Sequence, residues 1–392
     1  MKIIRLGVIL LVVMLLPSGC KNFWQTTPAG CTSNCSTVSS GIFYVLNSSI
    51  GQVEIAGYSI VNGALTTLSG SPYALPSAPF AIAVAPNNHF LYASTGSGIY
   101  LYTIGSSGVL TLSSTTPIAT DFAAHSIQVD ATNSWLVDAS ESGFLYAIPV
   151  NSSTGMTTGA VKQLSLAGIM PRQMVISPDN AEIFVALGIS GTEVIPFNAA
   201  NADPLPASGN ILIAVRNAGS AALSVAVDPS NRLFYIGETL GISTSTSANT
   251  GALRAFSYSS LSGTLTEITG SPFASGGLTP NSILPAPSGT YVYVANSTAS
   301  SSGNGSITGF AVSANGNSYS LAQVSGSPSV GITPAGMAED SSGSIVLLVN
   351  TGGSPDLDVF TFDATTPGKL DSVFTFATGT DPVGAVAVAA AP

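Results

Sequence analysis

Three side chains, His125, Glu141 and Arg172, are of the types that together could hydrolyse a carbonyl compound. The chain has 392 residues but only two histidines and five arginines, so a histidine and an arginine in corresponding parts of a repeat are informative. A histidine beside a carboxylate can act as a general base on water. An arginine nearby can stabilise the oxyanion that forms when the carbonyl of an ester or a lactone is attacked. These residues predict a hydrolytic site if the fold brings them together.

The elements that must position them belong to a segment that recurs seven times at intervals of roughly 50 residues. One copy is SAPFAIAVAPNNHFLYAS at residues 77–94, and another is TPNSILPAPSGTYVYVAN at residues 279–296. Each copy has a small residue or Pro, an apolar strand, a tight turn and a strand rich in Tyr, Phe and Val. Alternating Val, Ile, Tyr, Phe and Thr bounded by Gly, Pro, Asn and Ser is typical of strands and turns, and no long helical pattern appears.

Each unit divides into four predicted strands. The first strands cover residues 81–85, 126–130, 173–177, 224–228, 282–286, 336–340 and 384–389. A turn of the form PNN, PDN, PSN or PSG follows, in which Pro sets φ and Asn or Gly takes the left-handed position. The second strands contain Phe43, Leu91, Leu136, Ile183, Phe234, Val292 and Val346. The third strands carry an aromatic residue for which we expect packing between units: Tyr58, Tyr102, Phe197, Phe256, Phe310 and Phe360. The fourth strands lie in segments that resemble LTTLSGSP, at residues 65–72, 265–272 and 321–328.

Four short antiparallel strands in each of seven units predict an all-β, seven-bladed β-propeller over residues 41–392. The alternatives are an open solenoid and a ring of six or eight blades. The domain begins near Ile42 with a strand of the second type and ends at residues 384–389 with a strand of the first type. The C-terminal strand can therefore complete the first blade, which closes the ring and removes the exposed sheet edges of an open array.

This architecture predicts where the site lies, because the starts of the first strands and the ends of the second strands share one rim of the central channel. Residues at first-strand starts are Phe80, His125, Arg172, Leu223, Asn281, Ala335 and Val383. Residues at second-strand ends are Asn47, Thr95, Glu141, Glu238, Asn296 and Asn350. We predict that His125 is the base, that Glu141 or Glu238 orients it, that Arg172 stabilises the oxyanion and that Asn281 contacts the substrate. The alternative is that these polar side chains merely solvate the mouth of a channel.

Other candidate residues are better explained by structural roles. We expect His89 to be a surface turn residue, Arg254 to lie on the solvent face of a third strand, and Glu339 and Asp340 to be solvated at a turn. The Asp-x-Asp pair in residues 356–358 lacks further oxygen donors at the spacing of a calcium loop. The sequence contains no Ser nucleophile elbow, no phosphate-binding Gly loop and no metal triad, so we expect neither a metal nor a cofactor.

The N-terminus has the pattern of an export signal. Residues 1–19 carry two basic residues, a short apolar run and Pro-Ser-Gly, and Cys20 follows directly. This arrangement resembles the lipobox of bacterial lipoproteins, with Pro17 where Leu is usual, and it implies that Cys20 becomes a lipidated N-terminal residue. Lys21 favours the outer membrane over the inner one. The alternative is that the apolar run is a membrane anchor helix.

Residues 20–40 are rich in Ser, Thr, Gly and Pro, which is typical of a flexible tether. Cys31 and Cys35 would form one small disulfide in an oxidising compartment, whereas two thiols without a nearby His or Cys are poor zinc ligands. The formal charge is −10 and would become about −12 on loss of the two basic residues of the signal. With so few Lys and Arg residues, the sequence predicts no basic surface for nucleic acid or anionic lipid. Membrane attachment would therefore depend on the acyl anchor.

The repeated segments also resemble a known family. SGSPYALPSAPFAIAVAPNNHFLYAS and TEITGSPFASGGLTPNSILPAPSGTYVYVAN are similar to the bacterial seven-bladed propellers that include 6-phosphogluconolactonase and muconate-lactonising enzymes. The resemblance covers nearly all of residues 41–392 and implies the fold more strongly than any one reaction.

The family's site residues carry over only in part. The segment AAHSIQVD supplies His125 where the resemblance implies a histidine, and MPRQMVISPDN supplies Arg172 but has Gln173 in place of a second histidine. A family glutamate that would fall near Gly188 is absent, and Leu223 stands where the family has a second arginine. Glu141 and Glu238 occupy equivalent places in neighbouring blades. A phosphorylated sugar lactone is disfavoured, because its dianion would need more than one arginine and it is a cytosolic metabolite.

Two hypotheses follow. The leading one is a lipid-anchored, extracytoplasmic, monomeric propeller that hydrolyses an unphosphorylated lactone or ester. The competing one is a propeller without catalytic activity that presents its rims and long loops to a protein or glycan partner in the periplasm or at the cell surface.

Overall fold

The computed structural model describes residues 41–49, 52–61, 64–120, 124–206, 208–241, 250–259, 264–298, 304–316, 318–340, 342–352, 356–376 and 385–391. Cys20, Cys31, Cys35 and Val383 lie outside these residues, as do the predicted signal and tether. Within the described ranges no helix has the length and apolarity that crossing a membrane requires.

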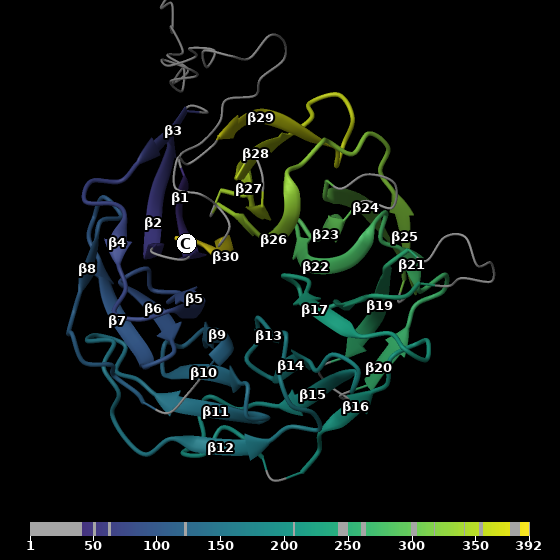
Figure 1. Cartoon of the computed structure of the whole chain (residues 1–392). Helices are drawn as coiled ribbons and strands as arrows, with labels where there is room; N and C mark the ends of the chain where they lie inside the picture. The colour runs from purple at the N-terminus through teal and green to yellow at the C-terminus, as the bar shows by residue number, and fades with distance from the viewer. Residues whose placement is uncertain are drawn as a thin grey trace, which may run out of the picture.

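The described chain forms seven antiparallel sheets that stand around a central axis as the blades of a propeller (Figure 1). The strands of blades 1 to 3 are β1 (Gly41–Ser49), β2 (Gln52–Val61), β3 (Ala64–Thr67), β4 (Tyr73–Ala74), β5 (Pro79–Val84), β6 (Phe90–Thr95), β7 (Gly98–Ile104), β8 (Leu110–Leu112), β9 (Ala124–Val129), β10 (Trp135–Ser140), β11 (Phe144–Pro149) and β12 (Lys162–Ser165). Those of blades 4 and 5 are β13 (Gln173–Ile176), β14 (Glu182–Ala186), β15 (Thr192–Pro196), β16 (Ile211–Ile213), β17 (Ala222–Val227), β18 (Leu233–Glu238), β19 (Ala252–Ser259), β20 (Thr264–Glu267) and β21 (Phe273–Ala274). Those of blades 6 and 7 are β22 (Leu278–Pro285), β23 (Tyr291–Thr298), β24 (Ser306–Asn315), β25 (Ser318–Gln323), β26 (Ile332–Glu339), β27 (Val346–Gly352), β28 (Leu357–Phe362) and β29 (Leu370–Phe376).

The ring closes through β30 (Ala385–Ala390), which pairs antiparallel with β1 as the innermost strand of blade 1 (Figure 1). Val45 lies opposite Val388 in this pairing. The prediction of a seven-bladed propeller closed by its C-terminal strand is therefore confirmed. Four strands per blade is also confirmed, with β4 and β21 added as short fifth strands to blades 1 and 5.

Tight turns between inner and second strands have the predicted backbone. Asn88, Asn180, Asn231 and Gly289 all have φ between 53° and 64°, so the Asn or Gly of each PNN, PDN, PSN or PSG turn takes the left-handed conformation. Asp340 is buried at the corresponding turn of blade 7 and accepts hydrogen bonds from the backbone N–H groups of residues 344 and 345. The prediction that Asp340 is solvated is wrong, because this carboxylate closes the turn.

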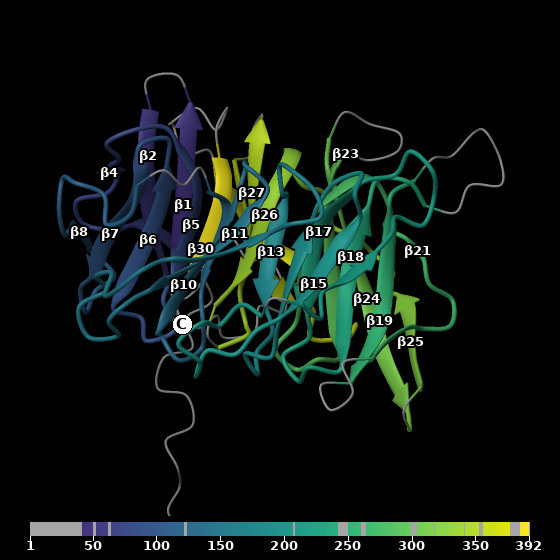
Figure 2. The ribbon, with the colours of Figure 1, turned by 90° about the horizontal axis from the view of Figure 1, so that it is seen from below.

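Hydrophobic side chains of the described residues form seven clusters, one in each interface between neighbouring blades. The recurrent aromatic residues of the third strands are all buried in these clusters, which confirms their predicted packing role: Tyr58, Tyr102, Phe197, Phe256, Phe310 and Phe360. Seen from the side, the strands run from one face of the disc toward the other (Figure 2). The core is thus distributed around the ring, which leaves the central axis for a cavity.

Candidate functional site

A cavity of about 460 Å³ lies on the propeller axis and is lined by the inner strands. The five described residues predicted at first-strand starts that line it are Phe80, His125, Arg172, Asn281 and Ala335. The prediction that first-strand starts gather around one mouth therefore holds for these five residues. Leu223, at the corresponding place in blade 5, is not among the residues that line the cavity.

His125 and Glu141 contact each other at this mouth, although they are 16 residues apart in the chain. His125 is the second residue of β9, and Glu141 directly follows β10, which pairs with β9 through Ala124 and Ser140. The hairpin therefore returns Glu141 to the level of His125, where Nε2 of the imidazole and Oε1 of the carboxylate form a hydrogen bond. Both side chains remain partly accessible, at 30% and 41% exposure, so a substrate could reach them.

Phe80 packs beside the imidazole from the neighbouring blade. The centroids of its ring and that of His125 are 5.6 Å apart, with an angle of 36° between the ring planes. Because the hydrogen bond to Glu141 uses Nε2 of His125, the proton of the neutral imidazole is held on that nitrogen and Nδ1 is left as the acceptor. Phe80 and Glu141 together therefore define the orientation and the tautomer of the predicted base.

Arg172 is exposed at the same mouth, one blade further along the ring. Its backbone N–H donates to the carbonyl of Ala186 at 2.8 Å, which fixes the start of β13 against β14. Among the described residues its guanidinium forms no hydrogen bond or ion pair. A guanidinium that no other described residue pairs with, in a cavity that it shares with His125, is available to an anionic or developing negative charge.

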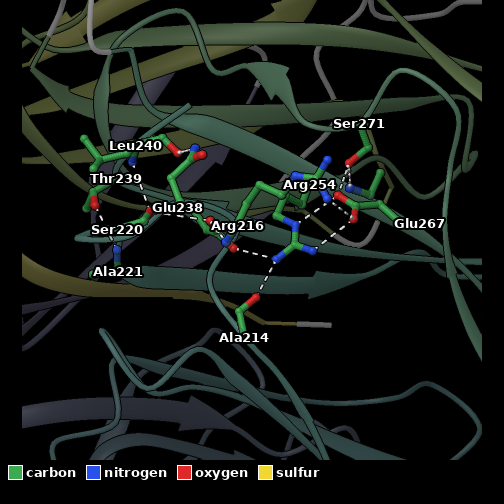
Figure 3. Close-up of polar contacts among 12 residues, drawn as sticks. Ala214, Arg216, Ser220, Ala221, Glu238, Thr239, Leu240, Arg254, Glu267 and Ser271 are labelled. Atoms are coloured by element: carbon green, nitrogen blue, oxygen red, sulfur yellow. Dashed lines mark hydrogen bonds and ion pairs between the residues drawn. The ribbon is translucent and has the colours of Figure 1, made fainter. Parts of the chain in front are cut away.

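Glu238 is not brought to this site. It is 1% exposed at the end of β18, where Oε1 accepts from Nη1 of Arg254 at 2.8 Å and Oε2 accepts from the backbone N–H of Arg216 at 2.9 Å (Figure 3). The register of β18 and β19 places Arg254 opposite Ile236, two residues before Glu238 and on the same face of the sheet. Of the two candidate carboxylates, Glu141 alone contacts His125, and Glu238 is committed to an ion pair inside blade 5.

The prediction that Arg254 lies on a solvent face is wrong. The side chain is 5% exposed, and its Nε and Nη2 each donate to a different carboxylate oxygen of Glu267 at 3.0 Å (Figure 3). Nη1 also donates to the carbonyl of Ala214 at 2.9 Å, so the guanidinium joins the loop before β17 to two strands of the blade. Burial raises the pKa of Glu267, but hydrogen bonds from Arg254 and Ser271 outweigh this effect and hold that pKa below its ordinary value.

Asn281 lines the cavity but also links two blades, because its Nδ2 donates to the carbonyl of Pro334 at 3.2 Å. Gln173, the residue found where the family resemblance implies a histidine, has a similar role. Its Oε1 accepts from the backbone N–H of Val225 at 3.0 Å, and Oε1 of Gln128 accepts from that of Ile176 at 2.7 Å. Inner-strand amides therefore bridge adjacent blades just inside the mouth.

The remaining second-strand ends do not surround the mouth as predicted. Their side chains are buried within the blades: Asn47, Thr95, Asn296 and Asn350. Oδ1 of Asn296, for example, accepts from the Ser275 hydroxyl at 2.6 Å, and its Nδ2 donates to the carbonyl of the same serine at 2.8 Å. Asn296 thus satisfies polar groups of the loop that leads into its own blade, which explains why it does not face the mouth.

The remaining histidine and acidic candidates lie away from the cavity. His89 is exposed in its turn, as predicted. Asp356 and Asp358 are both buried, and Oδ2 of Asp358 accepts from Nδ2 of Asn350 at 2.9 Å and from the backbone N–H of Gly331 at 3.1 Å. Over the described part of the chain, no three His, Cys, Asp or Glu side chains are grouped closely enough to hold a metal ion.

The sequence pattern did not predict one buried carboxyl, that of Asp138. Asp138 on β10 is fully buried, and neither of its oxygens has a hydrogen-bond partner among the described residues. Burial raises its pKa from 3.8 to about 8, so the carboxyl is mostly protonated at neutral pH. At the same register position the other blades carry aliphatic residues: Val45, Ala93, Val185, Ile236, Val294 and Leu348. The signal was a single Asp within an otherwise apolar second strand, WLVDAS.

Comparisons with known proteins agree with this fold. Residues 242–387 match the family model described as Lactonase, 7-bladed beta-propeller. A search of the curated proteins finds no match. Among solved structures, a proposed 6-phosphogluconolactonase from Bacteroides uniformis is 19% identical with a TM-score of 0.68, and the alignment covers 90% of this chain and 99% of that one.

Two further structures give similar values. A proposed 6-phosphogluconolactonase from Bacteroides fragilis is 20% identical, with a TM-score of 0.68 and coverage of 92% of this chain and 100% of that one. The periplasmic gluconolactonase PpgL of Pseudomonas aeruginosa is 19% identical, with a TM-score of 0.68 and coverage of 90% and 99%. The matched family model and the shared fold together confirm the resemblance of this chain to the lactonase-like seven-bladed β-propeller family.

Proposed function

We propose that this protein is an exported, lipid-anchored hydrolase that opens an unphosphorylated lactone or cleaves a related ester at the mouth of its propeller. The observation that carries the proposal is the contact between His125 and Glu141 beside the cavity that Arg172 also lines. A paired histidine and carboxylate with a cation in the same cavity is the set of groups that acyl hydrolysis by water needs.

In the proposed reaction the substrate carbonyl lies toward Arg172, whose guanidinium stabilises the negative charge that develops on the carbonyl oxygen. Nδ1 of His125 takes a proton from water as the water oxygen bonds to the carbonyl carbon. The bond between that carbon and the ring oxygen then breaks, and His125 returns the proton to the leaving alkoxide. The product is the hydroxy acid, and Glu141 keeps the imidazole oriented while it is charged.

An unphosphorylated substrate fits the charges of the site. Arg172 is the one Lys or Arg side chain among the described residues that line the cavity, whereas binding of a phosphate dianion favours several charge-assisted donors. The formal net charge of −10 also disfavours a doubly negative substrate. We propose that the enzyme works as a monomer without a cofactor.

The test incubates wild-type protein and His125→Ala with a panel of sugar lactones, alkyl lactones and aryl esters. A pH indicator measures the acid that hydrolysis releases. His89→Ala is the matched control, because it removes the other histidine, which is exposed in a distant turn. We expect wild type and His89→Ala to turn over the same substrate and His125→Ala to lose at least about 100-fold in kcat/KM. Equal turnover by wild type and His125→Ala would remove His125 from the mechanism.

Export and lipidation are tested separately. Labelled palmitate fed to a bacterial host should be incorporated into the wild-type protein and not into Cys20→Ser, and the wild type should fractionate with outer membranes. Recovery of both proteins in the soluble fraction without label would contradict the lipid anchor and leave the hydrolase proposal intact.

The burial of Glu238 favours a second candidate, a non-catalytic scaffold that binds a protein or a glycan. Only one of the two predicted carboxylates contacts His125, so the structure brings together fewer of the candidate catalytic residues than the sequence predicted. Absence of turnover across the panel, combined with glycan-array binding that Arg172→Ala abolishes, would favour the scaffold.

A further inference from the structure

Apolar side chains gather beside the proposed site. Ile169, Met170 and Ile189 are 73%, 47% and 80% exposed. Ile169 and Met170 lie in the loop between β12 and β13, and Ile189 lies in the loop between β14 and β15. Of the eight large apolar side chains with marked exposure in the described chain, five belong to blade 4 or to the loop that leads into it. Single exposed apolar residues are ordinary, but a group of them marks a binding surface.

These two loops are fastened to the residues of the proposed mechanism. The backbone N–H of Met170 donates to the carbonyl of Glu141 at 3.2 Å, so the first loop is tied to the residue that contacts His125. The second loop reaches Arg172, because a methyl group added to Gly188 would lie 3.9 Å from Nε of that arginine. Ile189 follows Gly188 directly. The apolar group therefore flanks both the base and the cation.

The two loops also contact each other and are held in place. A methyl group added to Gly168 would come within 2.7 Å of Oγ of Ser190, which shows how closely the loops pack. Gly188 and Ala222 exchange two backbone hydrogen bonds, at 3.1 and 2.9 Å, which fix the second loop to the inner strand of blade 5. The exposed apolar side chains thus stand on a connected part of the rim.

We propose that Ile169, Met170 and Ile189 form a subsite for an alkyl or acyl chain carried by the lactone or ester substrate. This inference rests on the proposed function. Three side chains are too few for a protein partner, since a standard interface buries about 800 Å² on each side. A lipid surface is also disfavoured, because the chain has only nine Lys and Arg residues in all and peripheral membrane binding normally combines apolar residues with several basic ones.

The occupant is then a small molecule with a polar head and an apolar tail. The carbonyl lies between His125 and Arg172, and the tail extends over Ile169 and Ile189. Full burial of a methylene would change affinity about fourfold, and an open surface that covers one side of the chain should give about twofold per methylene. Substrates with longer chains should therefore have lower KM values with little change in kcat.

The experiment compares γ-butyrolactone, γ-octalactone and γ-dodecalactone with wild type, the double variant Ile169→Ser/Ile189→Ser and the control Ile211→Ser. Ile211 is 43% exposed on the outer strand β16, away from the mouth. We expect KM of wild type and of the control to fall about twofold per added methylene, and KM of the double variant to be independent of chain length with unchanged kinetics for γ-butyrolactone.

Failure of this inference is distinguishable from failure of the proposed function. Turnover of all three lactones without any dependence on chain length, or equal loss in the control, would overturn the subsite and leave the hydrolase proposal standing. If no lactone is turned over, the hydrolase proposal fails, and calorimetry with unreacted γ-dodecalactone measures the subsite directly. Lack of binding, or binding that the double variant does not weaken, would then overturn the subsite as well.

Discussion

The buried carboxyl of Asp138 predicts a specific dependence of stability on pH. Its pKa is 3.8 in an ordinary environment and about 8 in the folded protein, because burial disfavours the charged form. Between these two values the unfolded chain is ionised and the folded chain keeps its proton. The folded state therefore binds more protons, and its free energy of unfolding falls as pH rises through this window.

The magnitude follows from the size of the change. At about 1.4 kcal/mol per pH unit, a pKa that rises from 3.8 to about 8 corresponds to roughly 6 kcal/mol lost between pH 4 and pH 8. This figure is an upper limit, because local opening that admits water would lessen it. Replacing the group by Asp138→Asn keeps the shape and removes the ionisation. We therefore expect the free energy of unfolding of the variant to exceed that of wild type by an amount that grows with pH.

Urea unfolding of both proteins at pH 5, 6, 7 and 8 and constant ionic strength measures this difference. We expect it to rise by about 1 kcal/mol or more per pH unit and to level off above pH 8, where Asp138 is ionised in both states. Asp203→Asn, which changes an exposed aspartate, is the control and should show no such rise. Parallel pH profiles for wild type and Asp138→Asn would refute the argument from burial.

Three further predictions concern the ion pair, the rim and the base. Arg254→Met should lower the free energy of unfolding by about 3–5 kcal/mol, because it leaves buried Glu238 without its partner; urea unfolding should show that adding Glu238→Gln recovers part of the loss, and no recovery would argue against the pair. Gly191→Ala should destabilise by about 2 kcal/mol or more, because φ is +98° and its Cβ would meet the carbonyl oxygen of Ile213 at 2.2 Å; an unchanged thermal midpoint would contradict this. Glu141→Gln should lower kcat of the proposed hydrolase about 10- to 100-fold with little change in KM, and steady-state kinetics that show a change in KM alone would point to substrate binding instead.

The architecture could be predicted from sequence because its signals are local and repeated. In each turn, the Pro and the Asn or Gly that follows it favour the backbone conformation that the turn requires. The seven copies of the strand pattern indicate the number of blades. The contact of His125 with Glu141 was also predictable, since both residues belong to one hairpin whose length sets where they meet. For this pair a local rule was sufficient, because the turn between β9 and β10 is tight.

Other features depend on which face of a sheet a residue occupies and on what covers it. Arg254 alternates with apolar residues in the way an exposed strand residue would, yet Glu238, Glu267 and the carbonyl of Ala214 surround it. Those partners come from two other strands and a loop spread over residues 214–267, so their convergence on Arg254 depends on how the whole blade folds. Asp138 is a similar case, because what surrounds it in the interface between blades 2 and 3, where no described residue forms a hydrogen bond with its carboxyl, comes from two blades.

The pairing of β1 with β30 has a consequence for how the protein folds. Blade 1 is assembled from segments at opposite ends of the described chain, as Val45 and Val388 show. Blades 2 to 7 can each form from one continuous stretch of roughly 50 residues. Blade 1 can be completed only after the other six blades have brought β30 next to β1. Loop closure over such a distance is entropically costly and gives the protein a high contact order. Completion of this blade is therefore the step at which we expect folding to be slowest, and an incomplete ring would expose the inner edge of β1 to other chains.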